Sequence, residues 1–360
     1  MASSIFFCIT LATINSFKIF DQVNIITEGG PGFSTTVLVQ AIYYYAFKEY
    51  KIGYAAAVAI VLFVIIFIFS TVLQKLEENS HTRRLYHGIS EKTSGNTYHY
   101  HDHCRDICLM FIFPFLWMLS TSFKYEIDVM EFPVHLIPQR WNFQNYVTVF
   151  TKSDFPGYYL NSIKVTFITI IGELCITTMA AYAFARLKFR GKKILFMVYL
   201  STMMVPGQVL LLPKYIYFQS MHITNTHLAL ILPGLFSVFG VLLMRQVFMQ
   251  IPFEYTEAAY LDGASHPAIF LKLILPLAKP GLMTALLLAF SWSWNDYINP
   301  LVFLSNDKLF TLTVGLQRFQ EDASTNYALI MAGATVSLIP LIILFLFTQK
   351  YFIESFASAG

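Results

Sequence analysis

The chain has 360 residues, of which 56% are hydrophobic and only 12% are charged, with a formal net charge of +3. Soluble domains carry about 25% charged residues, so this chain has too few charges to face water on all sides. So small a net charge gives no indication of a nucleic-acid partner. The composition predicts a membrane protein, and the competing interpretation, a large soluble enzyme, does not account for apolar runs of bilayer length.

Eight apolar stretches are long enough to cross a bilayer as helices, which takes about 20 residues each. They cover residues 3–20, 53–73, 106–122, 158–184, 194–212, 227–248, 280–302 and 327–349. The expected fold is therefore an all-α polytopic membrane protein with about eight transmembrane helices. Val205, Pro206 and Gly207 are expected to break the fifth span. The start of the chain lacks a basic n-region, so no cleaved signal peptide is expected.

The basic residues predict the orientation of these spans. Residues 185–193 contain Arg186, Lys188, Arg190, Lys192 and Lys193. Loops rich in Lys and Arg face the cytoplasm, so this one is expected inside. Alternation then places residues 74–105, 245–279 and 350–360 inside as well, and residues 21–52, 123–157, 213–226 and 303–326 outside. Both chain ends are expected to be cytoplasmic.

The segment 79–104 is polar, rich in histidine and without apolar periodicity. His99, His101, His103 and Cys104 are residue types that bind zinc, so a metal site is one interpretation. The other is a disordered joint, because histidine-rich tracts often have no function of their own. We favour the joint and expect no metal, since nothing in the sequence would order the ligands.

An internal repeat predicts the domain organisation. Residues 11–76 resemble residues 287–350, with Asn15 matching Asn295 and Tyr54 matching Tyr327. A pair of spans therefore occurs twice, but four further spans precede only the second pair. The simplest interpretation is an amino-terminally truncated subunit joined through residues 79–104 to a nearly complete second subunit.

Between the sixth and seventh spans, residues 251–282 predict a helix–turn–helix on the cytoplasmic side. Residues 254–261 should form a short helix with acidic residues in its first turn. Gly263 supplies a turn that other residues would adopt only with strain. Ser265 is placed to cap a second short helix. Leu275 and Pro276 are expected to end that helix before the next span begins.

Residues in this loop are suited to binding a partner. The small residues Ala258, Ala259 and Gly263 allow close approach, and Glu257 and Asp262 offer charge-assisted hydrogen bonds to basic donors. An isolated E-A-A triplet is common on surface helices. The candidate site therefore depends on the full spacing rather than on the triplet.

That spacing resembles a known docking signature. The string E-A-A-x-x-x-G (257–263), then nine residues and L-x-L-P (273–276), resembles the loop of permeases from binding-protein-dependent ABC importers. The strings W-N-D (294–296), N-P-L (299–301) and T-L-T-V-G-L (311–316) are similar to the carbohydrate branch of that family, especially the maltose G-type subunit, over about 106–360. The strings E-G-G-P-G-F-S-T (28–35) and K-I-G-Y-A-A-A (51–57) resemble the end of an F-type partner. The expected organisation is an F-like fragment over 1–78, a joint over 79–104 and a G-type permease domain over 105–360.

The resemblance implies a multi-pass permease subunit of a sugar importer in a bacterial cell membrane. Its implied partners are a homodimer of ABC ATP-binding subunits, a second permease of the F type, an extracytoplasmic solute-binding protein, the sugar and the membrane lipid. No phosphate-binding G-x-x-x-x-G-K-[ST] string is present, so the chain is expected to be no enzyme, to bind no cofactor and to leave ATP hydrolysis to a partner.

Three other interpretations stay open. The chain could be a non-functional fusion or frameshift remnant of two adjacent permease genes. It could carry glycerol 3-phosphate instead of a sugar. A channel or receptor that needs no ATPase is the third, and the docking signature argues against it.

Candidate residues for a substrate path lie in two spans. Glu173 is an ionisable residue in mid-span, which favours a functional role. Its alternative is a structural hydrogen bond to Thr169 or Thr177, one helical turn away on the same face. Trp292, Trp294, Asn295 and Asp296 are residue types that bind sugars. Their alternative is structural, because tryptophan gathers at membrane interfaces and Asn and Asp take part in polar helix packing.

Overall fold

The computed structural model describes residues 12, 16, 19–84, 97–133, 135–152, 154–205, 207–322 and 326–357. Every regular element in these ranges is helical, which confirms the expected all-α class. The N-terminal elements are α2 (Asp21–Ile26), α3 (Leu38–Tyr43), the π-helical turn η1 (Tyr44–Lys48) and α4 (Ile52–Arg84). The central elements are α5 (Thr97–Ser122), α6 (Glu126–Val129), α7 (Gln144–Lys152), α8 (Phe155–Arg186), α9 (Lys192–Ser201), η2 (Thr202–Met204), η3 (Gly207–Leu210), α10 (Leu211–Ser220), α11 (Leu228–Gly234) and α12 (Val238–Gln250). The C-terminal elements are α13 (Glu254–Leu261), α14 (His266–Ile269), the π-helical turn η4 (Phe270–Ile274), α15 (Leu275–Leu277), α16 (Lys279–Trp294), α17 (Ile298–Phe303), η5 (Asp307–Leu309), α18 (Leu312–Asp322) and α19 (Tyr327–Ala357).

Four segments of the described chain are long and apolar enough to cross a membrane. They are Ile52–Phe69, Phe155–Arg186, Leu228–Gln250 and Tyr327–Tyr351, and the bent pair His266–Leu277 and Lys279–Trp294 makes a fifth if it is counted as one span. The four match the expected spans at 53–73, 158–184, 227–248 and 327–349. Met110–Ser122 is a shorter apolar helix within the expected span at 106–122. Most of the stretch 3–20 lies outside the described residues.

Three expected spans are not continuous helices, and one of them, 227–248, is divided between α11 and α12 at residues 235–237. The prediction of one span over 194–212 is wrong as a single helix, because α9 ends at Ser201 and α10 begins only at Leu211. This break includes Val205 and Gly207, where the sequence predicted an interruption. The stretch 280–302 is likewise divided between α16 and α17, which are separated at residues 295–297. Hydropathy measures composition, so it does not detect where the backbone turns.

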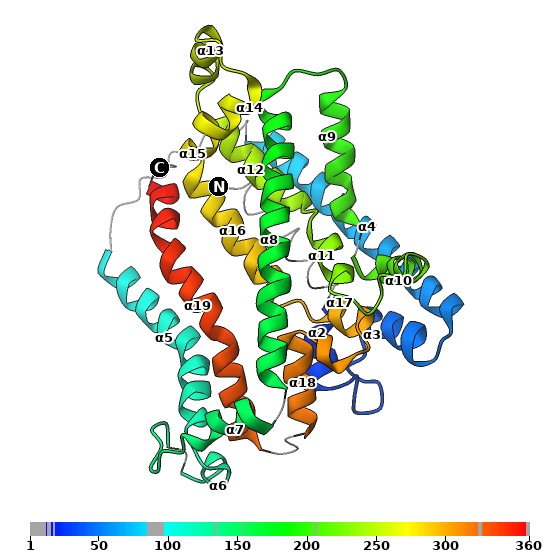
Figure 1. Cartoon of the computed structure of the whole chain (residues 1–360), viewed down its shortest axis with the longest axis vertical. Helices are drawn as coiled ribbons and strands as arrows, with labels where there is room; N and C mark the ends of the chain where they lie inside the picture. The colour runs from blue at the N-terminus through cyan, green and yellow to red at the C-terminus, as the bar shows by residue number, and fades with distance from the viewer. Residues whose placement is uncertain are drawn as a thin grey trace.

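Long helices form the central bundle, in which α8 packs against α12 and α16, and α19 packs along α5 and α16 (Figure 1). The hairpin of α13 and α14 lies at one end of this bundle, together with the loop from α8 to α9. Helices α6, α7 and α18 lie at the other end. The basic loop and the acidic hairpin therefore share one end of the molecule, as expected if both face the cytoplasm.

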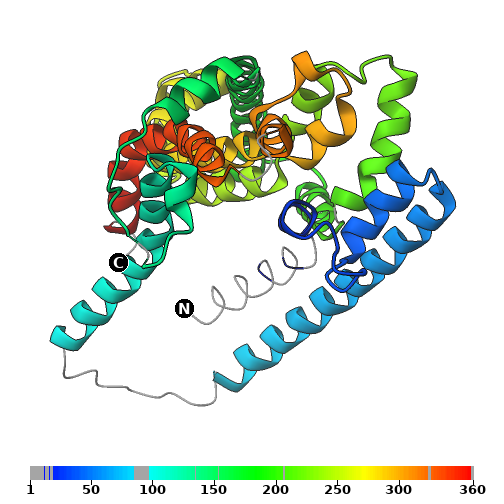
Figure 2. The ribbon, with the colours of Figure 1, turned by 90° about the horizontal axis from the view of Figure 1, so that it is seen from below.

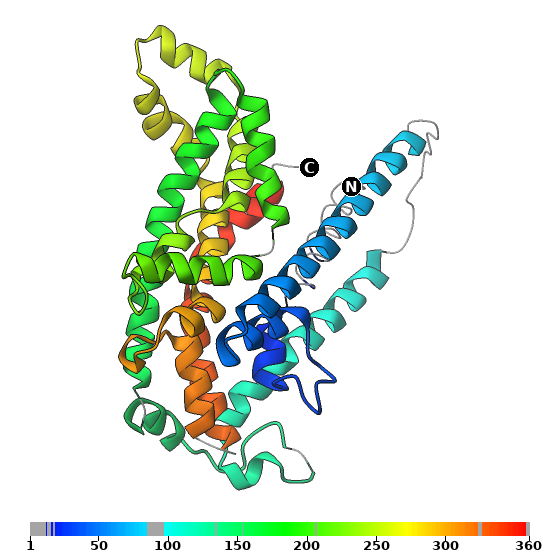
Figure 3. The same ribbon diagram turned by 90° about the vertical axis from the view of Figure 1, so that its right-hand side faces the viewer.

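The N-terminal unit, residues 19–69, packs on one side of this bundle (Figure 2; Figure 3). One hydrophobic cluster contains Phe20, Val39 and Leu62 of this unit together with Leu211 and Phe303 of the bundle. Burying such side chains stabilises the contact by roughly 1.5–3 kcal/mol each. Since the two parts share a core, this unit is not a loose appendage.

Both ends of the predicted joint are helical. Helix α4 continues to Arg84 and α5 starts at Thr97, so residues 79–84 and 97–104 differ from the irregular segment that the sequence predicted. Residues 85–96 lie outside the described part of the chain. The side chains of His99, His101, His103 and Cys104 are also outside it, so the structure does not test whether they form a metal site.

Candidate functional site

Helix α13 has the bounds expected from the sequence, Glu254–Leu261. Its end is closed by Gly263, whose φ of 77° lies in the left-handed region. The Ala264 amide donates to the Ala259 carbonyl at 2.9 Å, and the Gly263 amide donates to the Tyr260 carbonyl at 2.9 Å. This pair of bonds is a Schellman motif, which satisfies carbonyls that the helix end would otherwise leave unpaired. Gly263 therefore fixes the direction in which the chain leaves α13.

The second half of the hairpin differs from the prediction in where it ends. Ser265 stands at the N-cap of α14 in extended conformation, as expected, although its side chain makes no capping bond. Leu275 and Pro276 do not end the helical path, because they form the start of α15. A proline in the first helical turn is tolerated, since its missing N–H has no partner there anyway. The break lies at Ala278, where the chain turns by 82° into α16.

The hairpin presents its signature residues to its surroundings. Glu257, Ala258, Asp262 and Gly263 are exposed, and Ala259 is half-buried. Large apolar side chains lie beside them, with Leu261 89% and Tyr255 52% exposed. The Tyr260 hydroxyl lies 2.8 Å from Nδ1 of His266 and so joins α13 to α14. An exposed surface that mixes carboxylates with large apolar residues is typical of a protein-binding site.

The root of the hairpin is held by a residue that the sequence did not single out for this role. The Arg186 guanidinium at the end of α8 donates to the Phe248 carbonyl at 2.6 Å and to the Ile251 carbonyl. It also lies over the ring of Phe253, 5.6 Å from the centroid. Arg186 is buried, with 6% of its surface exposed. One side chain therefore ties α8, the end of α12 and the first residues of the hairpin together.

Aromatic packing completes this root. The Phe270 ring in η4 lies 5.1 Å from the Tyr182 ring of α8 and 6.5 Å from the Phe248 ring of α12. Ile269 and Ile274 are fully buried in the same cluster. A movement of the hairpin therefore displaces the ends of α8 and α12 with it, since packed cores shift as units rather than deform continuously. The arrangement is a mechanical connection between an exposed hairpin and the long helices.

A second feature is a polar cavity of about 310 Å³ in the middle of the bundle, between α8, α10, α11, α16 and α17. Glu173 and Asp296, both expected on a substrate path, line it. Lys214, from the segment predicted to face outside, lines it with them. Two carboxylates and one ammonium thus share one cavity, and Trp292 forms part of its wall.

Glu173 does not make the structural bonds that were its alternative. Its side chain lines the cavity together with Ser237, in the break between α11 and α12. The hydroxyls of Thr169 and Thr177 are buried and have no hydrogen-bond partner in the described part of the chain. Glu173 therefore faces the cavity from α8, beside the broken span.

Asp296 is held by the next turn of the chain. The Asn299 side-chain amide donates to both carboxylate oxygens, at 3.1 and 3.0 Å, and the Asn299 backbone amide donates to Oδ1 at 3.3 Å. The Thr313 hydroxyl donates to the Asp296 backbone carbonyl at 2.6 Å. The W-N-D, N-P-L and T-L-T-V-G-L strings thus meet at one residue, Asp296. Sequence spacing alone did not reveal this contact.

Trp294 and Asn295 are placed elsewhere. The Trp294 indole donates to the Ser337 carbonyl at 3.0 Å and stacks on Phe290 in a packed cluster with α19. The exposed Asn295 side chain donates to the Ser291 carbonyl of its own helix. Neither residue lines the polar cavity, whereas Trp292, which is 52% exposed, does. Residues two positions apart point in different directions around the axis of α16, so Trp292 faces the cavity and Trp294 faces α19.

The part of the chain that contains the hairpin and the polar cavity is similar to known proteins. The sequence profile of the family described as binding-protein-dependent transport system inner membrane component matches residues 174–357. The probable ABC transporter permease protein YurM of Bacillus subtilis is 36% identical over 250 residues, 69% of this chain and 83% of that protein. The arabinooligosaccharides transport system permease protein AraQ of Halalkalibacterium halodurans is 31% identical over 71% of this chain and 92% of its own length.

A solved structure agrees with these sequence matches. The crystal structure of a bacterial ABC transporter involved in the import of the acidic polysaccharide alginate contains a chain similar to this one. The TM-score is 0.63 at 26% identity, and the match covers 73% of this chain and 100% of that chain. The profile match includes the hairpin, Asp296 and α19. The two sequence matches extend over most of the length of each relative. The chain therefore belongs to the family of binding-protein-dependent transport system inner membrane components.

Proposed function

We propose that the chain is a permease subunit of an ATP-driven importer of neutral oligosaccharides, with the 254–277 hairpin as its ATPase-docking element. As a member of its family it is a multi-pass membrane component and not an enzyme, and it works with an ATPase, a solute-binding protein and a second permease. The finer proposal is that the ATPase is a homodimer and that the second permease is of the F type. We also propose that the end of the bundle that carries the hairpin faces the cytoplasm.

The observation that carries the proposal is the connection from the hairpin to the polar cavity. Glu257 and Asp262 are exposed for basic groups of an ATPase, and the hairpin root is packed on α8 and α12. Glu173 on α8 and Ser237 at the N-cap of α12 both line the cavity. A displacement of the hairpin therefore reaches the cavity through two rigid helices. Such rigid-body coupling is the usual means by which one site changes another.

The cavity chemistry supports a sugar as the substrate. The lining combines carboxylates, an ammonium and hydroxyls, which offer hydrogen-bond donors and acceptors, with the apolar ring of an exposed tryptophan. Two carboxylates against one lysine disfavour a phosphate group, which argues against glycerol 3-phosphate. The relative AraQ belongs to an arabinooligosaccharides transport system, and the solved transporter is involved in the import of alginate, so both are linked to glycans.

Uptake into vesicles tests this function. The chain is reconstituted with its ATPase, second permease and binding protein, and ATP-dependent uptake of labelled arabinotriose is measured. We expect Asp296→Asn to lower uptake about tenfold while the complex still assembles, because a charge-assisted contact worth about 1.4 kcal/mol is lost. Glu131→Gln, an exposed carboxylate at the far end of the bundle, is the control and should not change uptake. Assembly without any uptake by the unaltered chain would favour a fusion remnant.

A further inference from the structure

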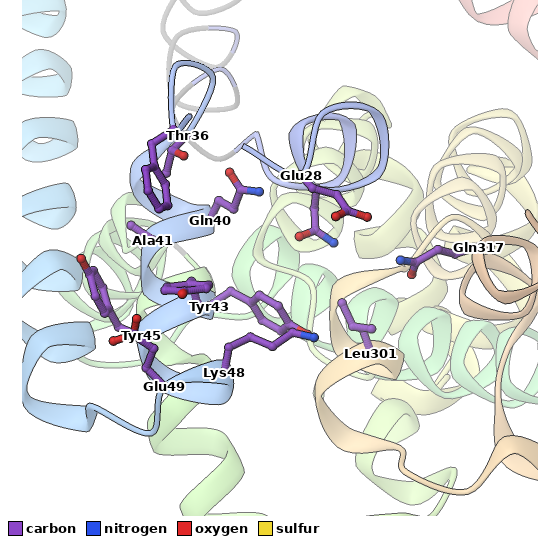
Figure 4. Close-up of a pocket in the computed structure, with 13 residues that line it drawn as sticks. Glu28, Thr36, Gln40, Ala41, Tyr43, Tyr45, Lys48, Glu49, Leu301 and Gln317 are labelled. Carbon is purple, nitrogen blue, oxygen red and sulfur yellow. The ribbon is translucent and has the colours of Figure 1, made fainter. Parts of the chain in front are cut away.

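We infer that a second oligosaccharide site lies at the seam between the N-terminal unit and the bundle, outside the polar cavity. This inference rests on the proposed function, because it assigns another site to the same class of substrate. A cavity of about 750 Å³ opens there, lined by residues of α2, α3 and η1 on one side and by Leu301 and Gln317 on the other (Figure 4). Its volume is within the range of about 300–1,000 Å³ that is usual for small-molecule sites. We call it the seam cavity.

The strongest sign of a ligand is Gln40. Its side chain lines the seam cavity and is 93% buried, since only 7% of the residue is exposed. Its Oε1 atom has no hydrogen-bond partner in the described part of the chain. A buried acceptor without a partner costs about 1–3 kcal/mol, so it needs a compensating donor. Sugar hydroxyl groups supply such donors.

The wall beside Gln40 is aromatic and irregular in backbone. Tyr43, Tyr44 and Tyr45 line the cavity in succession, and Tyr44 is 42% exposed. Tyr44 and Tyr45 belong to the π-helical turn η1, which also carries Lys48. Such turns are frequent at functional sites. Tyrosine combines a flat apolar ring with a polar tip, which suits the C–H face and the hydroxyl edge of a pyranose.

The charges in the seam cavity indicate a neutral ligand. Glu49 is paired with Lys51 at 2.7 Å, which leaves Glu28 and Lys48 as one acid and one base in the lining. The E-G-G-P-G-F-S-T string supplies Glu28, and Gly29 behind it has a φ of 87°. A Cβ at Gly29 would lie 2.7 Å from Thr36 Oγ1 and 3.1 Å from Gln40 Oε1, so glycine lets this loop pack closely against two residues of the lining. The E-G-G-P-G-F-S-T string therefore forms part of the wall of the seam cavity.

The seam cavity is next to the proposed substrate path. Helix α17 separates the two, with Asn299 and Pro300 lining the polar cavity and Leu301 lining the seam cavity. The buried Tyr297 hydroxyl donates to Gln317 and accepts from Asn24 Nδ2 at 3.2 Å, and both partners line the seam cavity. Residues 21–52 and 303–326 are the segments expected outside. The seam cavity would thus hold a glycan before it passes Tyr297 to reach Asp296.

Binding to the purified full chain in nanodiscs, without ATPase or binding protein, tests the inference. Arabinotriose, maltotriose and diacetylchitobiose are titrated as probes by isothermal calorimetry. We expect saturable binding of at least one probe and an increase in Kd of about tenfold for Gln40→Ala and for Tyr45→Ala. Tyr217→Ala, which removes an exposed tyrosine of α10 outside the cavity, should bind like the unaltered chain. No binding of any probe, or equal binding by all variants, would overturn the inference.

A labelling experiment covers the case in which these variants fold poorly. Tyr45→Cys is placed in a chain whose native cysteines are replaced by serine, and a maleimide reports access to its thiol. Saturating probe should slow labelling at Tyr45→Cys severalfold and leave labelling at Tyr217→Cys unchanged; equal protection at both positions, or none, contradicts the site. If Asp296→Asn weakens binding of the probe but Gln40→Ala and Tyr45→Ala do not, the seam site fails while the proposed function stands.

Discussion

Arg186 is the residue on which the hairpin root depends most. Its buried guanidinium makes two hydrogen bonds to carbonyls that end α12, where no helical donor remains. Both bonds come from Nη2, so a lysine would keep the charge and the donors but would lose the planar group that lies over the Phe253 ring. The residue therefore positions the hairpin rather than binding any substrate.

Replacing Arg186 should loosen the hairpin. We expect Arg186→Met to lower the free energy of unfolding by about 2 kcal/mol and the Tm in detergent by a few degrees, because buried carbonyls lose charged donors. It should also reduce the stimulation of ATP hydrolysis by loaded binding protein. Arg186→Lys should recover part of both losses. Arg190→Met, an exposed arginine in the same loop, is the matched control; an equal effect there would contradict the account.

The residue scale is also where the sequence was least informative. Glu173 and Asp296 were expected on a substrate path and share one cavity, because isolated charges within spans have few other uses. Trp292 and Trp294 are the same residue type near the end of one span, so composition does not distinguish them. Trp294 packs against α19, and this contact depends on how α16 and α19 cross. Arg186 was one of five basic residues in a loop. Its special role depends on the end of α12, which is 62 positions away in the chain.

At the scale of elements, α13 and its turn were predictable because their signals are local. Pro252 precedes the helix, acidic residues fill its first turn, and Gly263 ends it. The interruption between α9 and α10 includes Val205 and Gly207, where the sequence predicted it, whereas the break at Ala278 lies two residues beyond the predicted Leu275 and Pro276. Sharp bends in helices are almost always at prolines, and Pro276 and Pro280 flank Ala278, so the sequence indicates the region of the bend but not its residue.

A pair of glycine substitutions tests the turn of the hairpin. Gly263 has positive φ and Gly53 does not, while an added Cβ would meet nothing within 4 Å at either position. Gly263→Ala should therefore cost about 1–2 kcal/mol through the backbone alone and weaken ATPase binding. Gly53→Ala should be neutral or slightly stabilising. Equal binding of the ATPase by both variants would show that the turn geometry has no part in docking.

For the whole molecule, the internal repeat predicted two related pairs of spans but not how they pack. Tyr54 and Tyr327 each lie in the first turn of a long helix, α4 and α19. The N-terminal unit shares its hydrophobic cluster with the bundle, through ring contacts such as Phe47 with Tyr215 at 5.6 Å. We interpret residues 1–78 as an F-like fragment that packs in cis on the G-type domain.

Crosslinking tests this packing. In a chain whose native cysteines are replaced by serine, Phe47→Cys and Tyr215→Cys together should be joined by a short bifunctional maleimide, because the rings that the two cysteines replace lie 5.6 Å apart and the linker spans the gap they leave. Moving the second cysteine two residues along, to Tyr217→Cys, should abolish the crosslink. Electrophoresis after limited cleavage in the 79–104 segment reads the result. A crosslink at neither position would contradict the shared core.

The central claim is that the chain couples to an ATPase through the exposed Glu257 on α13. The most direct measurement is co-purification of the ATPase with the full chain, comparing the unaltered protein, Glu257→Lys and the distant control Glu131→Lys. We predict that the unaltered chain and Glu131→Lys retain the ATPase, and that Glu257→Lys retains at least about tenfold less, because the charge reversal repels the basic partner. Equal retention by all three proteins, or no retention by the unaltered chain, would contradict the claim.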